Sequence, residues 1–336
     1  MSHLIDYVKL IRPYGILFIG FTPVFGALCN GQFDLFRLCI LLLIGLLGHI
    51  FVFVQNDYYD VEVDRRSKYV DQRPLTRGVL SQTNARILYL GCFFISLLLA
   101  CVFFFSVWSF TVLFLSFILM TLYNRYSKKL PLMEYVLGAA VFLYGIFGAL
   151  TISDEISRFA VIISGVAFLQ WVFSVGVSAN LKDVEFDTQQ GIKTTPVLFG
   201  VHAIGTQLKK PVSFVMYTYG ILLLHLSIAL LPFVFGYSSF LLNGYPIPLG
   251  GYLLLALILF ITTQGILSAP LNRRDQMLRY EGIHEGLALL LLPVVLFSYL
   301  TEHFDVILPS LLLIVMILWP LLCLRILYGK RLIPLE

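Results

Sequence analysis

The chain has 336 residues, of which 59% are hydrophobic and only 12% are charged, and its formal net charge is +4 at pH 7. This composition lacks the polar surface that a soluble protein of such length requires, so it excludes a soluble globular domain and predicts an integral membrane protein. The five cysteines are scattered without CxxC or His-rich spacing, which indicates neither a zinc site nor a redox compartment.

Apolar stretches of membrane length recur along the whole chain. A bilayer is crossed by about 18 or more apolar residues in a helix, whereas strands of a membrane barrel show short alternating segments, so the spans are expected to be helices. The first stretch follows the amphipathic start MSHLIDYVKLIRP without a small-residue cleavage pattern, which predicts a retained helix. The expected fold is all-α and polytopic, with nine to ten transmembrane helices. The candidate spans are 14–30, 37–57, 85–105, 107–123, 133–152, 159–180, 211–235, 248–268, 286–300 and 306–326.

The second span ends in an acidic sequence, QNDYYDVEVD. On a helix, Asn56, Asp57, Asp60 and Asp64 share one face, and Glu62 points the other way. A carboxylate at a bilayer is unfavourable unless a cation or ligand compensates it, so this cluster predicts a functional site.

The sixth span ends in a similar sequence, NLKDVEFD. Asn180, Asp183 and Asp187 repeat the same spacing at a constant offset of 123 residues, with Glu185 on the opposite side of the expected helix. Two copies with one spacing favour a functional pair over two solvated helix ends.

The repeat also predicts the organisation of the chain. An Arg-Pro pair introduces the first span, and Lys-Leu-Pro introduces the fifth. We expect a single membrane domain with two related four-helix halves, 1–130 and 131–270, followed by a terminal pair of helices in 271–336. Such halves place their shared site at the interface between them.

The basic residues predict which side of the membrane each loop faces. Of the 23 Lys and Arg residues, only Arg37 and Arg158 fall on one side of the ten spans. The positive-inside rule then places both termini and both acidic motifs on the cytoplasmic side of the cell membrane. Span 286–300 is short and contains Pro293, so it could be re-entrant or broken. If the chain has nine spans, its C-terminal end faces the opposite side of the membrane, and the predicted site is unaffected.

The oxygen-rich faces of the two motifs suit a hard divalent cation. An aspartate face can hold Mg²⁺ that bridges to a diphosphate. Basic residues near the motifs, including Arg73, Lys128 and Lys193, could neutralise phosphate oxygens, although topology alone also explains their side of the membrane. The predicted metal ligands are Asp57, Asp60, Asp64, Asp183 and Asp187.

Other polar residues are interpreted as structural. His49 and His225 lie in spans and are expected to be hydrogen-bonded packing residues. His284 is expected in a loop, as are His202 and His303. The stretch NRRDQMLRYEG, 272–282, is interpreted as a solvated loop, although it could line the mouth of a substrate site.

Both motifs resemble those of the UbiA-type intramembrane prenyltransferase superfamily, which pairs NDxxDxxxD after its second helix with DxxxD after its sixth. The matching stretches are NDYYDVEVDRRSKYVDQRPLTRG and NLKDVEFDTQQGIKTTPVLFG, and the similar layout covers roughly residues 1–270. Many relatives have Asp where this chain has Asn180, which removes one direct metal ligand. The resemblance assigns catalytic roles to Asp60, Asp64, Tyr123, Lys128, Asp183 and Asp187, and diphosphate binding to Asn56, Arg73, Asn180 and Lys193.

The resemblance implies a Mg²⁺-dependent enzyme that moves a polyprenyl group from an allylic diphosphate to a lipophilic acceptor and releases diphosphate. The acceptor would be an aromatic or quinone precursor or geranylgeranylglyceryl phosphate. Two Mg²⁺ ions would bridge to the substrate diphosphate, and apolar and aromatic walls would shield an allylic carbocation from water. The expected partners are these two substrates and membrane lipids, and no nucleic acid.

Two alternatives remain open. An intramembrane terpene cyclase would use the same diphosphate without an external acceptor. A cation or phosphate transporter could also use acidic helix ends, but it should carry polar groups at the middle of the membrane, and here the acids gather at one face.

Overall fold

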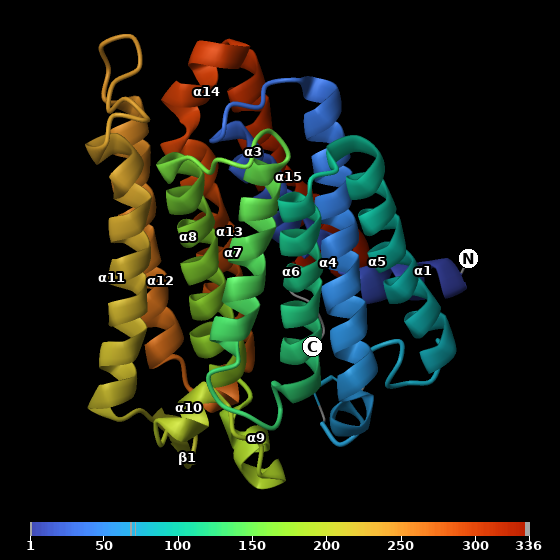
Figure 1. The fold of residues 1–336 in the computed structure, drawn as a ribbon. Helices are drawn as coiled ribbons and strands as arrows, with labels where there is room; N and C mark the ends of the chain where they lie inside the picture. Colours follow the sequence, from blue (N-terminus) through green and yellow to red (C-terminus); the bar gives the residue numbers. More distant parts are fainter. Residues whose placement is uncertain (1, 68, 71, 333–336) are drawn as a thin grey trace. The chain divides into compact units, whose positions relative to one another are not determined.

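The computed structural model of the chain describes residues 2–67, 69–70 and 72–332. Some residues used in the predictions lie outside the described ones. These are Lys68, one of the 23 basic residues, Asp71 in the loop after the first acidic motif, and 333–336 at the end of the terminal segment. The described chain is helical almost throughout (Figure 1), which confirms the all-α prediction.

The connections between the described helices include one small hairpin of strands. A π-helix, Ser174–Ala179, continues α8, and the strands β1 (His202–Ile204) and β2 (Gln207–Lys209) pair antiparallel. The α-helices are α1 Ser2–Ile11, α2 Ile16–Gly20, α3 Thr22–Leu28, α4 Leu35–Asp64, α5 Gln82–Phe104, α6 Val107–Tyr126, α7 Glu134–Leu150, α8 Arg158–Phe173, α9 Val184–Gln190, α10 Thr195–Leu198, α11 Val212–Val234, α12 Ile247–Ser268, α13 Arg274–Val295, α14 Phe297–Phe304 and α15 Ile307–Tyr328.

Eight segments of the described chain are long and apolar enough to cross a membrane. A ninth arises if Leu271–Val295 and Phe297–Phe304, bent by 51° to each other, are one span. Pro293 lies inside α13 just before this bend, which explains the break that the sequence suggested. Helix α7 is apolar but has only 17 residues, so the fifth predicted span is shorter than expected. The prediction of a polytopic integral membrane protein is confirmed.

The chain divides into two compact units, which are described separately. Unit 1 comprises 1–126, 139–164 and 319–336, and unit 2 comprises 127–138 and 165–318. The sequence repeat, with halves 1–130 and 131–270, stays a prediction.

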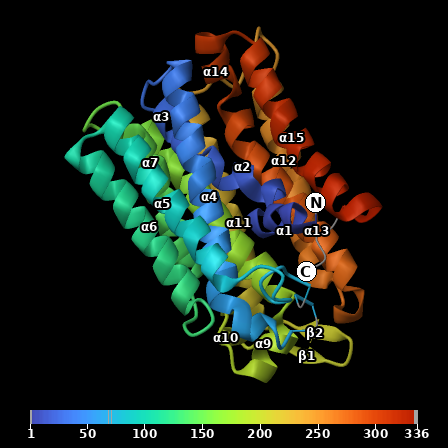
Figure 2. The ribbon, with the colours of Figure 1, turned by 90° about the vertical axis from the view of Figure 1, so that its right-hand side faces the viewer.

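Helix α4 makes most of the helix contacts of unit 1. It touches α1, α2, α3, α5 and α6, and Figure 2 shows α5 and α6 running alongside it. Asp34 begins this helix, because its side chain accepts a hydrogen bond from the backbone N–H of Arg37 at 2.8 Å. The 30 residues of α4 carry the first acidic motif at its other end.

Glycines let the helices of unit 1 approach closely. A Cβ on Gly45 would lie 2.0 Å from the carbonyl oxygen of Gly20, and a Cβ on Gly26 would lie 1.9 Å from that of Gly145. Small residues at such crossings are typical of membrane helices, where association depends on close van der Waals packing. These contacts fix α2 against α4 and α3 against α7.

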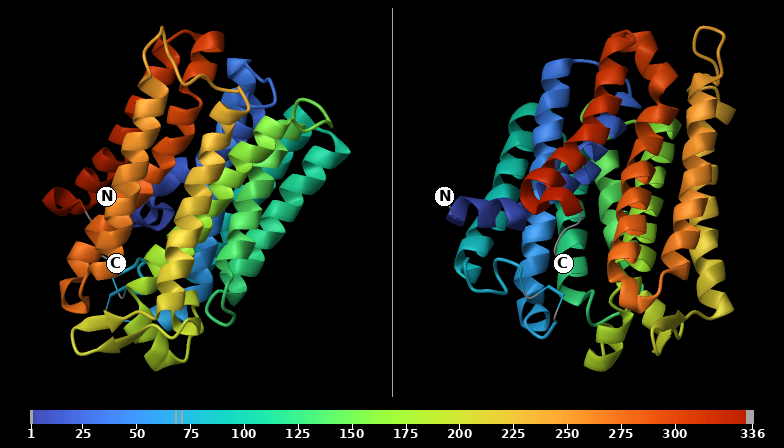
Figure 3. Two further views of the ribbon diagram at one scale, coloured as in Figure 1. Left: turned by 90° about the vertical axis from the view of Figure 1, so that its left-hand side faces the viewer. Right: turned by 180° about the vertical axis from the view of Figure 1, so that it is seen from behind.

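In unit 2, α12 and α13 pack along each other, and α11 contacts both. The short elements that follow α8, namely α9, α10, β1 and β2, gather at one end of these helices in Figure 3. The backbone N–H of Leu271 donates to the carbonyl oxygen of Thr206 at 2.8 Å, which ties the hairpin to the segment before α13.

Replacing Gly26 with Ala should destabilise the protein, because the new methyl group overlaps the backbone of Gly145. The expected loss in free energy of unfolding is about 1–3 kcal/mol, the usual effect of overpacking. Thermal unfolding in detergent measures it. Gly91→Ala on α5 is the control, since its Cβ meets no atom within 4 Å, and its stability should not fall. Equal melting temperatures for the two variants would contradict this packing.

Candidate functional site

The first acidic motif occupies the last turns of α4 in unit 1. The aspartates Asp57, Asp60 and Asp64 are only 3%, 6% and 5% exposed, whereas Glu62 is exposed. The prediction that the three aspartates share one helical face, with the glutamate opposite, is therefore confirmed. Asn56 is half-buried next to them.

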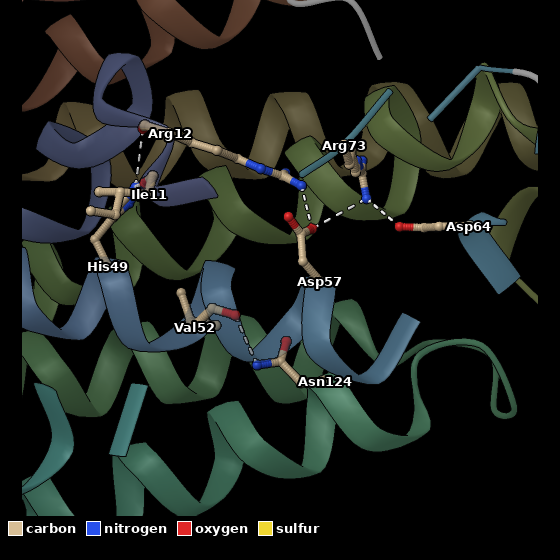
Figure 4. Close-up of polar contacts among 8 residues, drawn as sticks. All are labelled: Ile11, Arg12, His49, Val52, Asp57, Asp64, Arg73 and Asn124. Atoms are coloured by element: carbon tan, nitrogen blue, oxygen red, sulfur yellow. Dashed lines mark hydrogen bonds and ion pairs between the residues drawn. The ribbon is translucent and has the colours of Figure 1, made fainter. Parts of the chain in front are cut away.

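Two arginines hold these buried carboxylates (Figure 4). Nη2 of Arg12 lies 2.6 Å from Oδ1 of Asp57, and Nη1 of Arg73 lies 3.3 Å from the same oxygen and 2.8 Å from Oδ2 of Asp64. Both guanidinium groups are themselves largely buried, at 11% and 15% exposure. Charge-assisted hydrogen bonds of this kind compensate the desolvation of the acids.

Arg12 is a site residue that the sequence analysis missed, since its Arg-Pro pair served only as a sign of the repeat. It adopts the left-handed backbone conformation, with φ 52° and ψ 61°, which a non-glycine residue rarely takes. Nε2–H of His49 donates to the carbonyl oxygens of Ile11 and Arg12, at 3.1 and 3.3 Å (Figure 4). The prediction of a hydrogen-bonded packing role for His49 is thus correct, and the contact supports the turn that directs Arg12 toward Asp57.

A tryptophan near the other end of the chain supports the same turn. Nε1–H of Trp319 on α15 donates to the carbonyl oxygen of Pro13 at 2.7 Å. Two helices far apart in sequence, α4 and α15, therefore bind the backbone on both sides of Arg12. Nothing in the sequence pattern indicates this contact.

Helix α6 braces the acidic end of α4. The side-chain amide of Asn124 donates to the carbonyl oxygen of Val52 and to Oε1 of Gln55, both at 2.9 Å. Tyr123, the neighbouring residue and a predicted catalytic residue, is half-buried in unit 1. Lys128, another predicted catalytic residue, lies in the turn that follows α6 and belongs to unit 2.

The second motif is not on one continuous helix, so the predicted helical face is wrong there. The π-helix after α8 gives way at Lys182 and Asp183 to a turn, and α9 begins at Val184. Asp183 has φ −105° and ψ 2°, outside the helical range. Its side chain is 28% exposed, whereas Asp187, one turn into α9, is 1% exposed. Asn180 is half-buried and Lys193 is exposed.

Asp187 is a buried carboxylate with an unused oxygen. Oγ1 of Thr194 donates to its Oδ2 at 3.1 Å, but among the residues that the structure describes its Oδ1 has no hydrogen-bond partner. Burial raises the pKa of Asp187 from its ordinary value of 3.8 to about 6; the positive charge of Lys128 opposes this shift, and the negative charge of Asp183 adds to it. A buried carboxylate with a raised pKa and an oxygen that lacks a hydrogen-bond partner gains from binding a cation.

Asp183 is held by an arginine that the sequence analysis did not assign. Nη2 of Arg274 lies 2.7 Å from its Oδ1, and Nη1 donates to the carbonyl oxygen of Lys182 at 2.6 Å. The interpretation of 272–282 as a solvated loop is wrong, because most of it is the start of α13. His284, expected in a loop, is 2% exposed in the same helix. The sequence did contain a sign of this helix, since Arg274 and Glu281 are seven residues apart and would share one helical face.

Cationic side chains of the protein itself pair with several of these acids. Among the described residues, no group of three or more His, Cys, Asp or Glu side chains is arranged to hold a metal ion without rearrangement. Arg12, Arg73 and Arg274 bind the carboxylates of Asp57, Asp64 and Asp183 instead. The donors are still of the kind that Mg²⁺ prefers, and the free Oδ1 of Asp187 fits an additional cation.

Removing Arg73 should destabilise the ligand-free protein, since Asp57 and Asp64 would lose a shared buried partner. Arg73→Gln is expected to lower the free energy of unfolding by about 3 kcal/mol, the scale for breaking a buried ion pair. Chemical denaturation without divalent cations measures it. Arg65→Gln is the control, because the pair of Arg65 with Glu62 is 48% and 70% exposed and should contribute less than ~1 kcal/mol. Equal losses in the free energy of unfolding for the two variants would show that burial of Asp57 and Asp64 does not strengthen their pairing with Arg73.

Comparisons with known proteins agree with these motifs. The sequence model of the UbiA prenyltransferase family matches residues 17–275. The digeranylgeranylglyceryl phosphate synthase of Thermococcus kodakarensis is 28% identical over 247 residues, which cover 70% of this chain and 86% of that protein. A 4-hydroxybenzoate octaprenyltransferase of Francisella tularensis is 32% identical over 197 residues, 57% of this chain and 68% of that protein.

A solved structure shares the fold. It is that of a UbiA homolog from Archaeoglobus fulgidus bound to GPP and Mg²⁺, with a TM-score of 0.60 and 22% identity, covering 86% of this chain and 99% of that chain. Because the family match extends over more than half of the sequence and includes both acidic motifs, this chain belongs to the UbiA prenyltransferase family.

Proposed function

We propose that this protein transfers a polyprenyl group from an allylic diphosphate to a lipophilic acceptor and releases diphosphate, with Mg²⁺ as cofactor. The observation that carries the proposal is the row of buried aspartates on α4 held by Arg12 and Arg73. Buried acids and arginines side by side provide ligands for a cation and for phosphate oxygens. The named relatives, which are prenyl-transferring enzymes, support it.

Each acidic motif supplies oxygen ligands that would bind Mg²⁺. Asp57, Asp60 and Asp64 from unit 1, and Asp183 and Asp187 from unit 2, would hold Mg²⁺, which we propose as two ions. The Archaeoglobus fulgidus homolog, which is bound to GPP and Mg²⁺, supports the use of Mg²⁺ together with a prenyl diphosphate. When bound, Mg²⁺ supplies positive charge that stabilises the diphosphate leaving group. Asn56 and Asn180 would donate hydrogen bonds to the phosphate oxygens.

The basic residues bind and stabilise the departing diphosphate. Arg12 and Arg73 are already directed at the acidic face, so a diphosphate bound there would accept hydrogen bonds from both. Lys193 would reach the diphosphate from an exposed loop of unit 2. Lys128 acts electrostatically on Asp187 and would keep that carboxylate ionised. Tyr123 would present its ring to the allylic cation, since aromatic faces stabilise positive charge.

We infer that the site opens toward the cytoplasm. This orientation rests on the distribution of Lys and Arg, with 21 of the 23 on one side of the predicted spans. A prenyl diphosphate then enters with its charged head at the aqueous surface and its tail among the apolar helices. Labelling of single cysteines placed in loops on either side, in intact cells, tests the orientation.

One assay distinguishes the candidate activities. The purified protein is incubated with geranyl, farnesyl and geranylgeranyl diphosphates, with and without Mg²⁺, against hydroxybenzoate, naphthoate and geranylgeranylglyceryl phosphate acceptors. Mg²⁺-dependent diphosphate release that requires an acceptor is expected for the transferase. Release without an acceptor would indicate a terpene cyclase, and neither release nor diphosphate binding would favour a transporter.

Asp60→Asn and Asp187→Asn should each lower the turnover number by ~100-fold or more, because each removes a ligand that acts at the transition state. Steady-state kinetics and thermal unfolding together show that activity, and not folding, is lost. Glu62→Gln and Glu185→Gln change the same chemical group; Glu62 is exposed on α4, and Glu185 lies two residues, about 200° of helical turn, from Asp187 on α9. These controls should stay within ~3-fold of wild type, and full activity in either Asp variant would show that the metal ligands are misassigned.

Mg²⁺ binding should depend on pH through Asp187. Its pKa of about 6 means that a proton must leave below that pH before the carboxylate can bind a cation. We expect the apparent Mg²⁺ affinity to fall up to ~10-fold per pH unit below pH 6 and to be nearly constant above pH 7. Calorimetric titration over this range measures it, and Asp187→Asn should remove the dependence.

The same shift affects the stability of the metal-free protein. In the folded state the pKa of Asp187 is raised from 3.8 to about 6, so the folded protein binds this proton more tightly than the unfolded chain does. The contribution of Asp187 to the free energy of unfolding is therefore full below pH 3.8 and is lost as the pH rises through about 6. Mg²⁺ should therefore raise the melting temperature more at pH 7 than at pH 5. Equal shifts at both pH values would contradict the assignment of Asp187.

A further inference from the structure

A buried glutamate of unit 2 joins the two segments that flank the second acidic motif. Glu134, the first residue of α7, is 2% exposed. Its Oε1 accepts hydrogen bonds from Oγ1 of Thr195 on α10 at 2.5 Å and from the hydroxyl of Tyr217 on α11 at 3.1 Å. The same oxygen lies against the π-helix, since a Cβ on Gly176 would be only 2.8 Å from it. One carboxylate therefore lies against the segment before the motif and binds the segment after it.

The residue next to Thr195 connects this carboxylate to Asp187. Oγ1 of Thr194 donates to Oδ2 of Asp187 at 3.1 Å, and Thr194 is 4% exposed. Thr194 is the N-cap residue of α10, where a threonine usually accepts a hydrogen bond from a backbone N–H of the helix, but its side chain makes no such bond. Pro196, the second residue of α10, has no N–H to donate. The hydroxyl of Thr194 therefore serves Asp187 instead of the helix.

Helix α10 depends on its neighbours for its position. It has only four residues, and a helix of that length is not stable by itself. Glu134 holds its first residue, and the ring of Phe199 at its end packs against the ring of Tyr217, with centroids 5.0 Å apart. Helix α10 also contacts both the π-helix and α9. The contacts of α10, and of Glu134 in particular, thus determine where Thr194 meets Asp187.

Thr194 binds one oxygen of Asp187 and leaves the other available. Among the described residues Oδ1 has no hydrogen-bond partner, and the whole side chain is buried. A hydrogen bond to Oδ2 limits rotation of the carboxylate, so Oδ1 keeps a defined direction. Partners of this kind orient carboxylates that bind metal ions, and their removal commonly lowers metal affinity or activity by about 10–100-fold.

We propose that Glu134 is a positioning residue for Asp187. It fixes Thr195 against the π-helix, and the adjacent Thr194 then holds Asp187 so that Oδ1 is presented to Mg²⁺. This inference rests on the proposed function, because it requires Asp187 to bind Mg²⁺. Glu134 itself touches neither the metal ion nor the diphosphate in this arrangement. Its loss should therefore weaken the binding of Mg²⁺ and leave the chemical step largely intact once Mg²⁺ is bound.

Thr195→Val removes the hydroxyl that links Glu134 to α10 and keeps the side-chain size. Calorimetry with geranylgeranyl thiolodiphosphate, an unreactive analogue, measures the Mg²⁺ concentration that gives half-maximal binding. We expect this concentration to rise ~10-fold, the lower end of the range for a partner of a metal ligand. Thr218→Val is the matched control, because Thr218 is also 0% exposed in unit 2 and its Oγ1 donates to the carbonyl oxygen of Phe214 within α11. The control should stay within ~3-fold of wild type.

Two substitutions of Glu134 test the hydrogen-bond acceptor. Glu134→Met has a similar length and no oxygen, so the Mg²⁺ requirement should rise ~10-fold. Glu134→Gln keeps an oxygen that can accept from Thr195 and should restore the requirement to within ~3-fold of wild type. With the acceptor that the wild-type protein uses, kcat at saturating Mg²⁺ should fall no more than ~3-fold in Thr195→Val and Glu134→Met, whereas Asp187→Asn loses turnover even there.

Gly176→Ala displaces the same carboxylate from the side of the π-helix, and it is the second test if Glu134→Met does not fold. The new methyl group would lie 2.8 Å from Oε1 of Glu134, so the carboxylate must move. The Mg²⁺ requirement should again rise ~10-fold. Gly165→Ala on α8 is its control, because the nearest atom to the new methyl group, Cγ2 of Ile228, lies at an ordinary contact distance of 3.8 Å.

The outcomes separate the inference from the proposed function. A wild-type Mg²⁺ requirement in Thr195→Val or Glu134→Met would overturn the positioning role, and so would equal rises in Thr195→Val and Thr218→Val. A rise in Glu134→Gln as large as in Glu134→Met would also overturn it, because the acceptor oxygen would then not be what matters. A loss of kcat at saturating Mg²⁺ as large as that of Asp187→Asn would assign the network to the fold or the reaction instead. Failure of the wild-type protein to bind the analogue with Mg²⁺ would overturn the proposed function as well.

Discussion

The structure depends on one electrostatic requirement, which is that carboxylates buried at the ends of membrane helices need cations. Asp57 and Asp64 are almost fully buried on α4, and Arg73 binds both. An isolated charge in such surroundings is strongly unfavourable, and a guanidinium group with several donors can serve two carboxylates at once. The arginines keep the acidic face folded without a ligand, and the same groups suit a diphosphate that brings its own metal ions.

This requirement explains why parts of unit 1 that are distant in sequence converge on Arg12. The residue has a strained backbone, which costs about 1–3 kcal/mol and persists only when its surroundings enforce it. His49 on α4 and Trp319 on α15 bind the carbonyl oxygens around it. The strain is thus offset by contacts whose result is a guanidinium group placed 2.6 Å from Asp57. A helix near the C-terminus thereby contributes to a site near the N-terminus.

The two acidic motifs look alike in sequence but differ in physical state. The first lies on an unbroken helix, and arginines bind two of its aspartates. The second lies where a π-helix turns into α9, and Asp187 remains buried with a raised pKa and an unused oxygen. The protein's own arginines neutralise the first acidic face, whereas the second would gain from an added cation.

The sequence alone determined the membrane class, the helical fold, the two motifs and the buried face of α4, because hydrophobic run length and the helical period are local properties. The resemblance from the motifs led to the family that the match over residues 17–275 confirmed. Tertiary structure decided which cations hold which acids. Arg12 and Arg274 lie 45 and 91 residues from their aspartates, and no local pattern pairs them. Tertiary structure also decided the break at Lys182 and Asp183, because a π-helix and a turn arise from packing that a spacing of i, i+3 and i+7 does not encode.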